Sequence, residues 1–297
     1  MWTKDGAATL PFVLKQINHV IPKYAVRRRI IIDDNSSDDT KIIARKSGWS
    51  VHPNEGKGIS DAANTALGYV ESECFASFEQ DILLSPTWWP NVPKLLDDKL
   101  SAIASGIRLP TQPLSLRKFI EARERCLEQR EKNREDGNPF GYGKTLDNTV
   151  YRTDVMRSIG GFPRIPLQVQ CMLDNTLAQR IYDKGFKWKV DSNAKSLHIR
   201  KDFRDELRHN YWYGESEDFI FYYLTGKYPS IRTRLKLFLY SFVGGAKAAF
   251  EMNSPQLIYM CPLLQLAELE GLISDRKTGH SQQALVSMHE HASGSKA

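Results

Sequence analysis

Two pairs of carboxylates that follow apolar runs are the residues of this chain best suited to chemistry. Asp33 and Asp34 come directly after three isoleucines, and Glu79 and Asp81 follow a Cys-Phe-Ala-Ser-Phe run. A β-branched triplet is typical of a buried parallel strand, and ligands of open α/β sheets bind at the carboxyl ends of strands. The carboxylates after the isoleucines suit the donor groups of a nucleobase or ribose, or a metal ion, and they do not suit bare phosphate.

The spacing of Glu79 and Asp81 suits a divalent cation, because carboxylates two residues apart after a strand can both reach a hard ion held by oxygens. A simpler structural interpretation stands beside each pair. An ordinary acidic strand end would explain this pair, and an acidic strand-to-helix turn capped by Ser36 or Ser37 would explain the earlier one.

The elements that must position these carboxylates alternate between strand and helix, which predicts a parallel, doubly wound α/β sheet. Apolar periodicity predicts helices over 8–22, 39–46, 60–70, 86–99, 116–134 and 174–185, and strands over 29–32, 49–52, 74–78, 101–108, 186–190 and around 197. Residues 137–143 are expected to form a loop. From about residue 203 the pattern is helical and aromatic-rich, and the polar tail over 281–297 is expected to be disordered.

The composition is that of a globular protein with an anionic partner. The 297 residues carry a net charge of +6, which favours a nucleotide, an anionic membrane surface or nucleic acid as partner and does not choose among them. The four cysteines form no Cys-x-x-Cys pair, so neither a zinc ribbon nor a dense disulfide scaffold is indicated. The N-terminus has no apolar signal-peptide core, and we expect reduced thiols in the cytoplasm.

The last third of the chain combines aromatic, basic and apolar residues. Aromatic residues between 211 and 223 precede the basic residues Lys227, Arg232, Arg234 and Lys236, a pairing that suits a membrane interface with anionic lipid. The apolar segments 235–250 and 255–273 contain charges, so neither predicts a membrane span. Alternatively these helices simply cover the sheet. Nucleic acid explains the basic residues less well, because no recognised nucleic-acid module is present.

The run from Asp33 to Thr40 resembles the Asp-Asp-x-Ser-x-Asp-x-Thr signature of the family 2 glycosyltransferases, which have the GT-A fold. Further segments resemble the family in the same order, over roughly residues 3–200. The segment Asn54-Glu55-Gly56-Lys57-Gly58, with Asn64 in the helix that follows, is similar to its Asn-x-Gly-x-x-x-Ala-x-Asn segment. Glu79-Gln80-Asp81 lies at the place of its Asp-x-Asp metal motif, with Glu in place of the first Asp.

The resemblance implies a role for each candidate site residue. Nucleotide-binding roles fall on Asp33, Asp34, Ser36, Lys57 and Asn64. Asp81, Glu79 and His198 would hold Mn²⁺ or Mg²⁺, although a lone His is as often structural. Gly160, Gly161 and Phe162 would shape the donor and acceptor pocket. Asp174 would be the general base of an inverting enzyme, in a segment where Leu173 replaces the family's Glu, and a helix cap is the alternative explanation.

The function implied by the resemblance is sugar transfer from a UDP- or GDP-sugar to a glycan or polyprenyl-lipid acceptor, by a cytoplasmic enzyme that is peripheral on the inner face of the membrane. We expect a catalytic domain over 1–202, with a nucleotide-binding half 1–100 and an acceptor half 101–202. A helical, membrane-associating region over 203–280 follows it.

One departure from the family keeps alternatives open. The chain begins where the first apolar strand of the family should already be over, so that strand is expected to be missing and the base pocket incomplete. A non-catalytic relative that binds glycan or membrane is therefore one alternative. A sugar nucleotidyltransferase is another, although the Gly-rich loop with Arg or Lys that this class needs near its N-terminus is absent.

Overall fold

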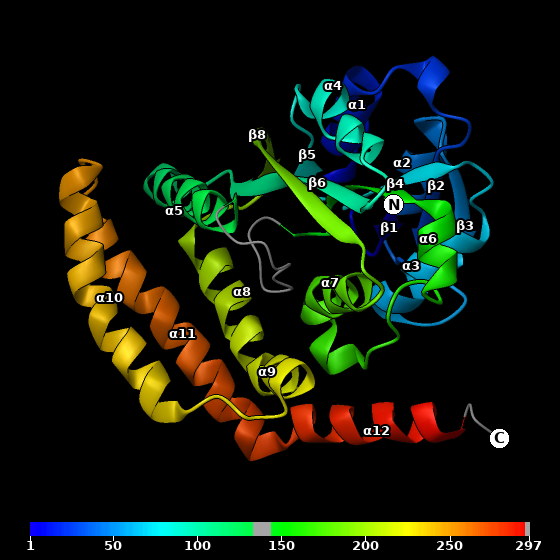
Figure 1. The fold of residues 1–297 in the computed structure, drawn as a ribbon. Coiled ribbons are helices and arrows are strands. Elements are labelled where there is room, and N and C mark those ends of the chain that lie inside the picture. Colours follow the sequence, from blue (N-terminus) through cyan, green and yellow to red (C-terminus); the bar gives the residue numbers. More distant parts are fainter. Residues whose placement is uncertain (133–143, 295–297) are drawn as a thin grey trace. The chain divides into compact units, whose positions relative to one another are not determined.

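The computed structural model describes residues 1–132 and 144–294, so the loop expected over 137–143 lies outside the described residues. The chain forms two units, each built from several segments (Figure 1). Unit 1 comprises Met1–Leu109, Arg123–Arg164 and Asp174–Ile199, and unit 2 comprises Pro110–Ala122, Ile165–Leu173 and Arg200–Ala297. The boundary expected at residue 202 is thus close to the last change of unit, but two earlier segments also belong to the helical unit.

Unit 1 begins with a parallel three-stranded sheet of order β1-β2-β3. Its elements are β1 (Trp2–Thr3), α1 (Leu10–Val20), the 3-10 turn η1 (Lys23–Ala25), β2 (Ile30–Asp33), α2 (Thr40–Lys46), β3 (Ser50–Pro53) and α3 (Gly58–Gly68). The β-branched side chains Ile31 and Ile32 are fully buried in β2, which is why the isoleucine run forms an interior strand. The strand–helix alternation predicted for this part of the chain is confirmed.

A first strand, which was expected to be missing, is present as the two residues of β1. Trp2 is paired with Ile32 and Thr3 with Asp33, both in parallel register. The N–H of Ile32 donates to the carbonyl of Met1 at 2.9 Å. On its other side Trp2 makes a parallel bridge to Glu79. This short strand therefore links the carboxyl end of β2 to the strand that leads into Glu79.

The second sheet of unit 1 has the order β4-β7-β6-β8-β5. Its strands are β4 (Cys74–Phe78), β5 (Ile82–Leu83), β6 (Ser101–Pro110), β7 (Asn148–Arg152) and β8 (Lys187–His198). The β4–β7, β6–β7 and β5–β8 pairs are antiparallel, so the α/β class is confirmed while parallel pairing is concentrated in the first sheet. The two strands expected over 186–190 and near 197 are one continuous strand, β8.

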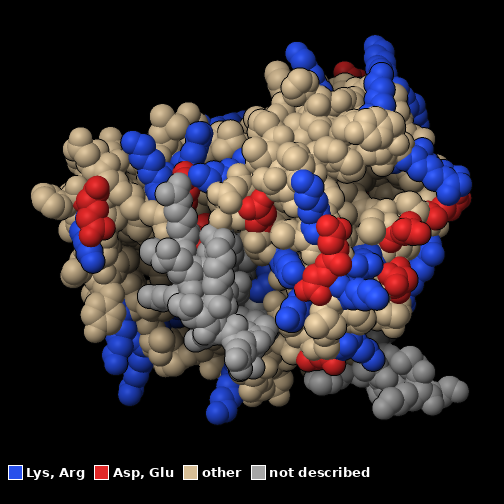
Figure 2. All heavy atoms as spheres, turned by 45° about the horizontal axis from the view of Figure 1, so that its top comes forward, with Lys and Arg blue, Asp and Glu red and all other residues tan. Residues whose placement is uncertain are grey.

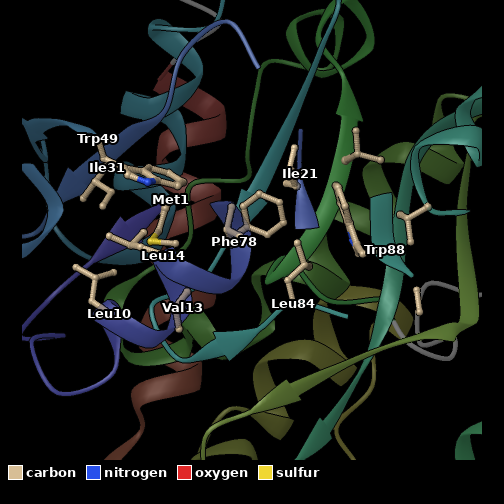
Figure 3. Close-up of a cluster of buried hydrophobic side chains, with 14 of the residues drawn as sticks. Met1, Leu10, Val13, Leu14, Ile21, Ile31, Trp49, Phe78, Leu84 and Trp88 are labelled. Carbon is tan, nitrogen blue, oxygen red and sulfur yellow. The ribbon is translucent and has the colours of Figure 1, made fainter. Parts of the chain in front are cut away.

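The core of unit 1 gathers behind both sheets. Helix α1 buries Leu10, Val13 and Leu14 on one face (Figure 3), as its helical spacing predicts. Phe78 and Trp88 meet edge to face with ring centroids 5.3 Å apart, and the indole N–H of Trp88 donates to the carbonyl of Asn148 at 2.7 Å. The sheet strands that lead to the polar residues described below are thus anchored by packed aromatic rings.

The helix expected over 86–99 is wrong in this structure. The segment forms only the short helix α4 (Trp88–Asn91) and the 3-10 turn η2 (Pro93–Asp97). Pro93 has no N–H to donate to the preceding turn, so the helix cannot continue through it. The remaining helices of unit 1 are α6 (Thr153–Ser158) and α7 (Leu173–Asp183), whose first residue belongs to unit 2, while α5 (Leu114–Lys132) starts in unit 2.

Unit 2 is helical. It contains the 3-10 turn η3 (Leu167–Met172), α8 (Phe203–Glu215), α9 (Glu217–Thr225), α10 (Ile231–Glu251), α11 (Leu257–Thr278) and α12 (His280–Gly294). Helices α8 and α11 pack at very close range, because a Cβ at Gly214 would collide with the carbonyl of Glu268 and one at Gly271 with the carbonyl of Tyr211. Among the described residues α11 is the one helix long and apolar enough to cross a membrane, and 44% of its most apolar window is buried.

The disordered tail expected over 281–297 is wrong for the part that the structure describes. Helix α12 extends to Gly294, and it buries Ala284 and Leu285. The N–H of Ser281 donates to the carboxylate of Asp275 at 2.9 Å, which ties its first turn to α11. Two buried apolar side chains and this bond supply the tertiary contacts that the polar composition of the segment does not reveal.

Candidate functional site

Polar side chains collect at one end of the second sheet. Phe78 is paired with Asn148 in the antiparallel β4–β7 ladder, so the next residues in each direction, Glu79 and Asp147, face each other beyond it. At the other edge Ile82 is paired with His198. The sheet therefore brings together residues that are separated by more than a hundred positions in the sequence.

Asp81 and His198 are in direct contact. The His198 Nε2 and the Asp81 Oδ2 are 2.8 Å apart, and the N–H of Ile199 donates to the carbonyl of Asp81 at 2.8 Å. The imidazole is 6% exposed and the carboxylate 28% exposed, so the carboxylate remains accessible from solvent. Two of the three expected metal ligands thus meet across the β5–β8 pair, and Glu79 precedes Asp81 by two residues.

Asp147 and Arg108 form a buried ion pair beside Glu79, and both were missed by the sequence analysis. The Nη1 of Arg108 lies 2.9 Å from Oδ2 of Asp147, whose side chain is 0% exposed. The hydroxyl of Thr145 and the amide of Asn148 each donate to the other carboxylate oxygen at 2.8 Å. Three donors hold this carboxylate in place, as a buried charge requires. Arg108 ends the strand predicted over 101–108, which was a usable signal, whereas no strand was predicted over 148–152 and Asp147 precedes that strand, so the sequence offered no such signal for it.

The carboxylates of this site crowd one another. Burial, together with the negative charges of Asp147 and Asp81, raises the pKa of Glu79 to about 8. Burial also raises the pKa of Asp174 to about 6, with Asp147 adding to the rise and Arg108 opposing it. Asp174 lies in the first turn of α7 and its Oδ1 accepts the N–H of Asn175 at 2.8 Å. The site therefore carries an excess of negative charge, and the positive charge of Arg108 opposes the rise in pKa of both Glu79 and Asp174.

The carboxylates after β2 are instead engaged by the chain itself. Asp34 accepts hydrogen bonds from the Asn54 amide at 2.8 Å and from the Gly58 N–H at 3.1 Å. Asp33 accepts the N–H of Ser36 at 3.0 Å. Its Oδ1 is buried and has no hydrogen-bond partner among the described residues, an acceptor that a bound ligand could satisfy. Asp33 pairs with Thr3 of β1, one strand away from Glu79.

Asn64 and Phe162 are brought together by two hydrogen bonds. The Asn64 amide accepts the N–H of Phe162 at 2.9 Å and donates to its carbonyl at 3.0 Å and to the carbonyl of Ser60 at 3.0 Å. Gly160 and Gly161 both have positive φ, which glycine adopts without strain. Phe162 is buried against Tyr151 with ring centroids 5.5 Å apart. This group holds the turn after α6 onto α3.

Lys57 is exposed and Ser36 is buried. Lys57 is exposed just before α3, and its N–H donates to Asp61 at 3.0 Å. The Ser36 hydroxyl accepts the N–H of Asp5 at 3.0 Å, which ties the loop after β1 to the loop after β2. The ammonium group of Lys57 is therefore the expected nucleotide-binding group that extends from the surface.

The donor set suits a divalent cation. Among the side chains that the structure describes, those of residues 1–124 and 144–288, no three His, Cys, Asp or Glu groups converge closely enough to hold a metal as they stand. Even so, two carboxylates and an imidazole are ligands that Mn²⁺ accepts. A divalent charge would also relieve the repulsion that raises the pKa of Glu79. Glu79, Asp81 and His198 thus fit a metal by their chemistry.

Comparisons with known proteins agree with this geometry. The profile described as Glycosyl transferase family 2 matches residues 3–159. No curated protein matches the sequence. Mannosyltransferase PcManGT from Pyrobaculum calidifontis in complex with GDP-Man and Mn²⁺ has a similar structure, with a TM-score of 0.54, 15% identity, and coverage of 98% of this chain and 78% of that one.

A second similar structure is glucosyl-3-phosphoglycerate synthase from Mycobacterium tuberculosis in complex with phosphoglyceric acid. Its TM-score is 0.51 at 15% identity, and the match covers 74% of this chain and 76% of that one. At these identities the two structures establish the fold, whereas the family profile spans more than half of the chain. The chain therefore belongs to glycosyl transferase family 2 and is a glycosyltransferase with the GT-A fold.

Proposed function

We propose that this glycosyltransferase moves a sugar from a nucleotide-diphosphate sugar to an acceptor hydroxyl with inversion at the anomeric carbon. The observation that carries the proposal is the gathering of Glu79, Asp81, His198 and Asp174 at one end of the second sheet. The strand β1 joins that end to Asp33 at the end of β2. Nucleotide and metal sites side by side are what transfer from such a donor requires.

The nucleotide lies, in this proposal, at the carboxyl end of β2. Asp33 offers its unpartnered Oδ1 to a donor group of the base or ribose. Asp34 and Ser36 keep the surrounding loops in position through their bonds to Gly58 and Asp5. The exposed Lys57 supplies positive charge for the diphosphate. Asn64 acts at one remove, by holding the Gly160–Phe162 turn that would border the donor sugar and the acceptor.

Glu79, Asp81 and His198 would hold Mn²⁺ or Mg²⁺. When bound, such an ion stabilises the negative charge that develops on the leaving diphosphate. The chain contributes the orientation of these ligands, since Asp81 is held by the backbone of Ile199 and His198 is the last residue of the twelve-residue strand β8.

Asp174 is the general base in this proposal. With a pKa of about 6, its carboxylate is ionised at neutral pH and still basic enough to accept a proton. The acceptor oxygen forms a bond to the anomeric carbon while the bond from that carbon to the diphosphate oxygen breaks. The hydroxyl proton moves to Asp174, and the nucleoside diphosphate leaves.

The donor class is supported by one structural neighbour, a mannosyltransferase that binds GDP-Man and Mn²⁺. The test is release of UDP or GDP from a panel of UDP- and GDP-sugars, with Mn²⁺ and with a chelator. Metal-dependent release that names one donor would support the proposal. No release and no nucleotide binding would favour the non-catalytic alternative, and formation of a sugar nucleotide from a nucleoside triphosphate would identify a nucleotidyltransferase.

The acceptor is proposed to be a glycan or a polyprenyl lipid presented at the inner face of a membrane, with this chain in peripheral contact. The favouring observation is the exposed apolar side of α10 in unit 2, where Val243 is 70% and Phe250 is 90% exposed. Transfer of label from the identified donor into the organic phase of a membrane extract would distinguish a lipid acceptor from a water-soluble glycan.

A further inference from the structure

Helix α10 exposes many large apolar side chains to solvent. Its large exposed apolar side chains are Ile231, Leu235, Leu237, Leu239, Tyr240, Phe242, Val243 and Phe250. Of these, Leu239, Val243 and Phe250 follow one another at helical spacing on one side. A soluble monomer does not keep several adjacent side chains of this size in water without a partner for them.

The fold does not need this side of α10 for its own packing. The opposite side of the helix buries Gly245, Ala248 and Ala249, and a Cβ at Gly245 would lie 2.6 Å from the carbonyl of Leu257. Small residues thus bring α10 against α11. The large side chains are left for something outside the described chain.

The first half of α11 extends the same kind of surface. Ile258 and Tyr259 are about half exposed, and Leu263 is 38% exposed. Since the backbones of α10 and α11 approach at Gly245 and Leu257, these residues lie beside the C-terminal half of α10. We call the exposed side chains of α10 and of 258–263 the apolar face of unit 2.

The charges along α10 are arranged by sign. No Asp or Glu occurs in the helix before Glu251. Arg232 and Lys236 are exposed one turn apart, and neither forms an ion pair with the described side chains of residues 1–124 and 144–288. Arg234, between them, points inward to Glu217 at 2.5 Å and Glu268 at 3.1 Å. Figure 2 shows the left edge of the surface as mostly neutral, with one acidic and one basic group together on it and further basic groups at the lower end.

We propose that the apolar face of unit 2 binds the surface of an anionic lipid bilayer, with α10 lying in the interface and the cations at its N-terminal end contacting the lipid phosphates. An apolar side bordered by cations and aromatic rings is suited to this place. A second copy of this chain fits less well as the partner, because the exposed Arg232 and Lys236 of one copy would repel those of the other.

Crossing the bilayer fits less well than lying on it. Helix α10 carries Lys236 and Lys247 on its exposed side, and the α11 carboxylate Glu268 is bonded to Arg234. A spanning pair of helices would place these charges in hydrocarbon. The proposal rests on the exposure and charge of these helices and does not depend on the proposed transfer reaction.

The experiment is flotation of the full chain with vesicles of phosphatidylcholine alone or of phosphatidylcholine with phosphatidylglycerol. We expect binding to the anionic vesicles, weakening with added salt, and release by an alkaline carbonate wash. Leu239→Glu with Val243→Glu should weaken binding at least tenfold. Arg232→Gln with Lys236→Gln should remove most of the preference for phosphatidylglycerol, about tenfold in affinity.

Phe12→Glu is the matched control, because Phe12 in α1 of unit 1 is as exposed as Leu239, at 64%. It should bind vesicles like the parent chain, and circular dichroism should show all variants folded. Vesicle binding unchanged in the Leu239→Glu, Val243→Glu variant, or absent in the parent, would overturn the proposal. So would resistance to carbonate, which would indicate spanning helices, or a dimer that the variant dissociates.

The parent chain and the Leu239→Glu, Val243→Glu variant also distinguish the membrane proposal from the proposed sugar transfer. Hydrolytic release of UDP or GDP without acceptor should be equal in the parent and the Leu239→Glu, Val243→Glu variant, since neither residue belongs to the catalytic unit. Vesicle binding without any nucleotide release would leave the lipid surface standing and count against the transfer reaction alone.

Discussion

The two acidic strand ends of unit 1 look alike in sequence and differ in their physical state. Asp34 after β2 has both oxygens bonded by the amide of Asn54 and the backbone of Gly58. Glu79 after β4 is surrounded by other carboxylates, and its pKa is raised to about 8. One carboxylate holds loops in shape, and the other is destabilised until a cation or proton arrives. Mutual repulsion of carboxylates that raises a pKa in this way is typical of a site that binds a ligand.

The largest effect should come from the base. Asp174→Asn removes the proton acceptor and should lower the transfer rate by about a hundredfold to ten-thousandfold. Donor binding should be nearly unchanged, because Asp174 contacts the acceptor in the proposed reaction. Rate measurements with the donor identified by the release panel would check this, and a variant retaining the parent rate would assign Asp174 to the helix cap.

The second largest effect on transfer is expected from removal of the metal ligand Asp81. Asp81→Asn, or removal of metal with a chelator, should reduce transfer about a hundredfold, and Mn²⁺ added back should restore only the parent chain. Nucleotide affinity measured by calorimetry with and without Mn²⁺ supplies a readout besides activity. Equal affinities under both conditions would contradict a metal at Asp81 and His198.

The crowding at Glu79 should appear in stability. Its folded-state pKa is about 8 and its ordinary value is 4.5, so the folded protein binds the proton more tightly. Without metal, this group's destabilisation is complete above pH 8 and disappears as pH falls toward 4.5, a difference on the order of a few kcal/mol. Glu79→Gln should abolish that part of the pH dependence in urea unfolding. An unchanged profile would contradict the crowding.

Asp34 should have the opposite effect from Glu79, because its carboxylate stabilises the fold and its removal should lower the free energy of unfolding. Asp34→Ala leaves the Gly58 N–H and the Asn54 amide without their partner and should cost about 1–2 kcal/mol of unfolding free energy. Asp39→Ala is the control, because Asp39 is exposed and makes no capping hydrogen bond. Equal free energies of unfolding for the two variants would contradict a stabilising role of Asp34 and hence the difference proposed between the two strand ends.

The smallest effect should come from Arg108. Its positive charge lowers the pKa of Asp174, so Arg108→Met should raise that pKa and move the acid limb of the activity profile upward from about 6. At pH 6 the rate should fall several-fold more than at pH 8. Arg108→Lys should restore most of the parent profile. A uniform loss across pH would indicate a structural role instead.

Much of unit 1 follows from local sequence. The isoleucine run, the apolar spacing of α1 and the run before Glu79 each predict an element that the structure contains. Asp147 and Arg108 were missed because their closeness to Glu79 depends on antiparallel register between strands far apart in the chain. Local periodicity contains no information about register across such separations.

Two further differences have local causes of another kind. Pro93 ends the helix expected over 86–99 although the apolar pattern continues through it. Helix α12 forms from a polar segment because Ala284 and Leu285 find buried places in unit 2. In the first case backbone chemistry overrides the pattern, and in the second tertiary contact overrides composition.

The bonds of Asn64 make α3 a mechanical link. The N-terminus of α3 is joined to β2 through Gly58 and Asp34, and its next turns hold the segment after α6 through Asn64 to Phe162 and Ser60 to Pro163. All of these bonds come from the part of α3 between Gly58 and Asn64. A displacement of the loop after β2 should therefore be coupled through α3 to the turn after α6, although the two segments are about a hundred residues apart in the sequence.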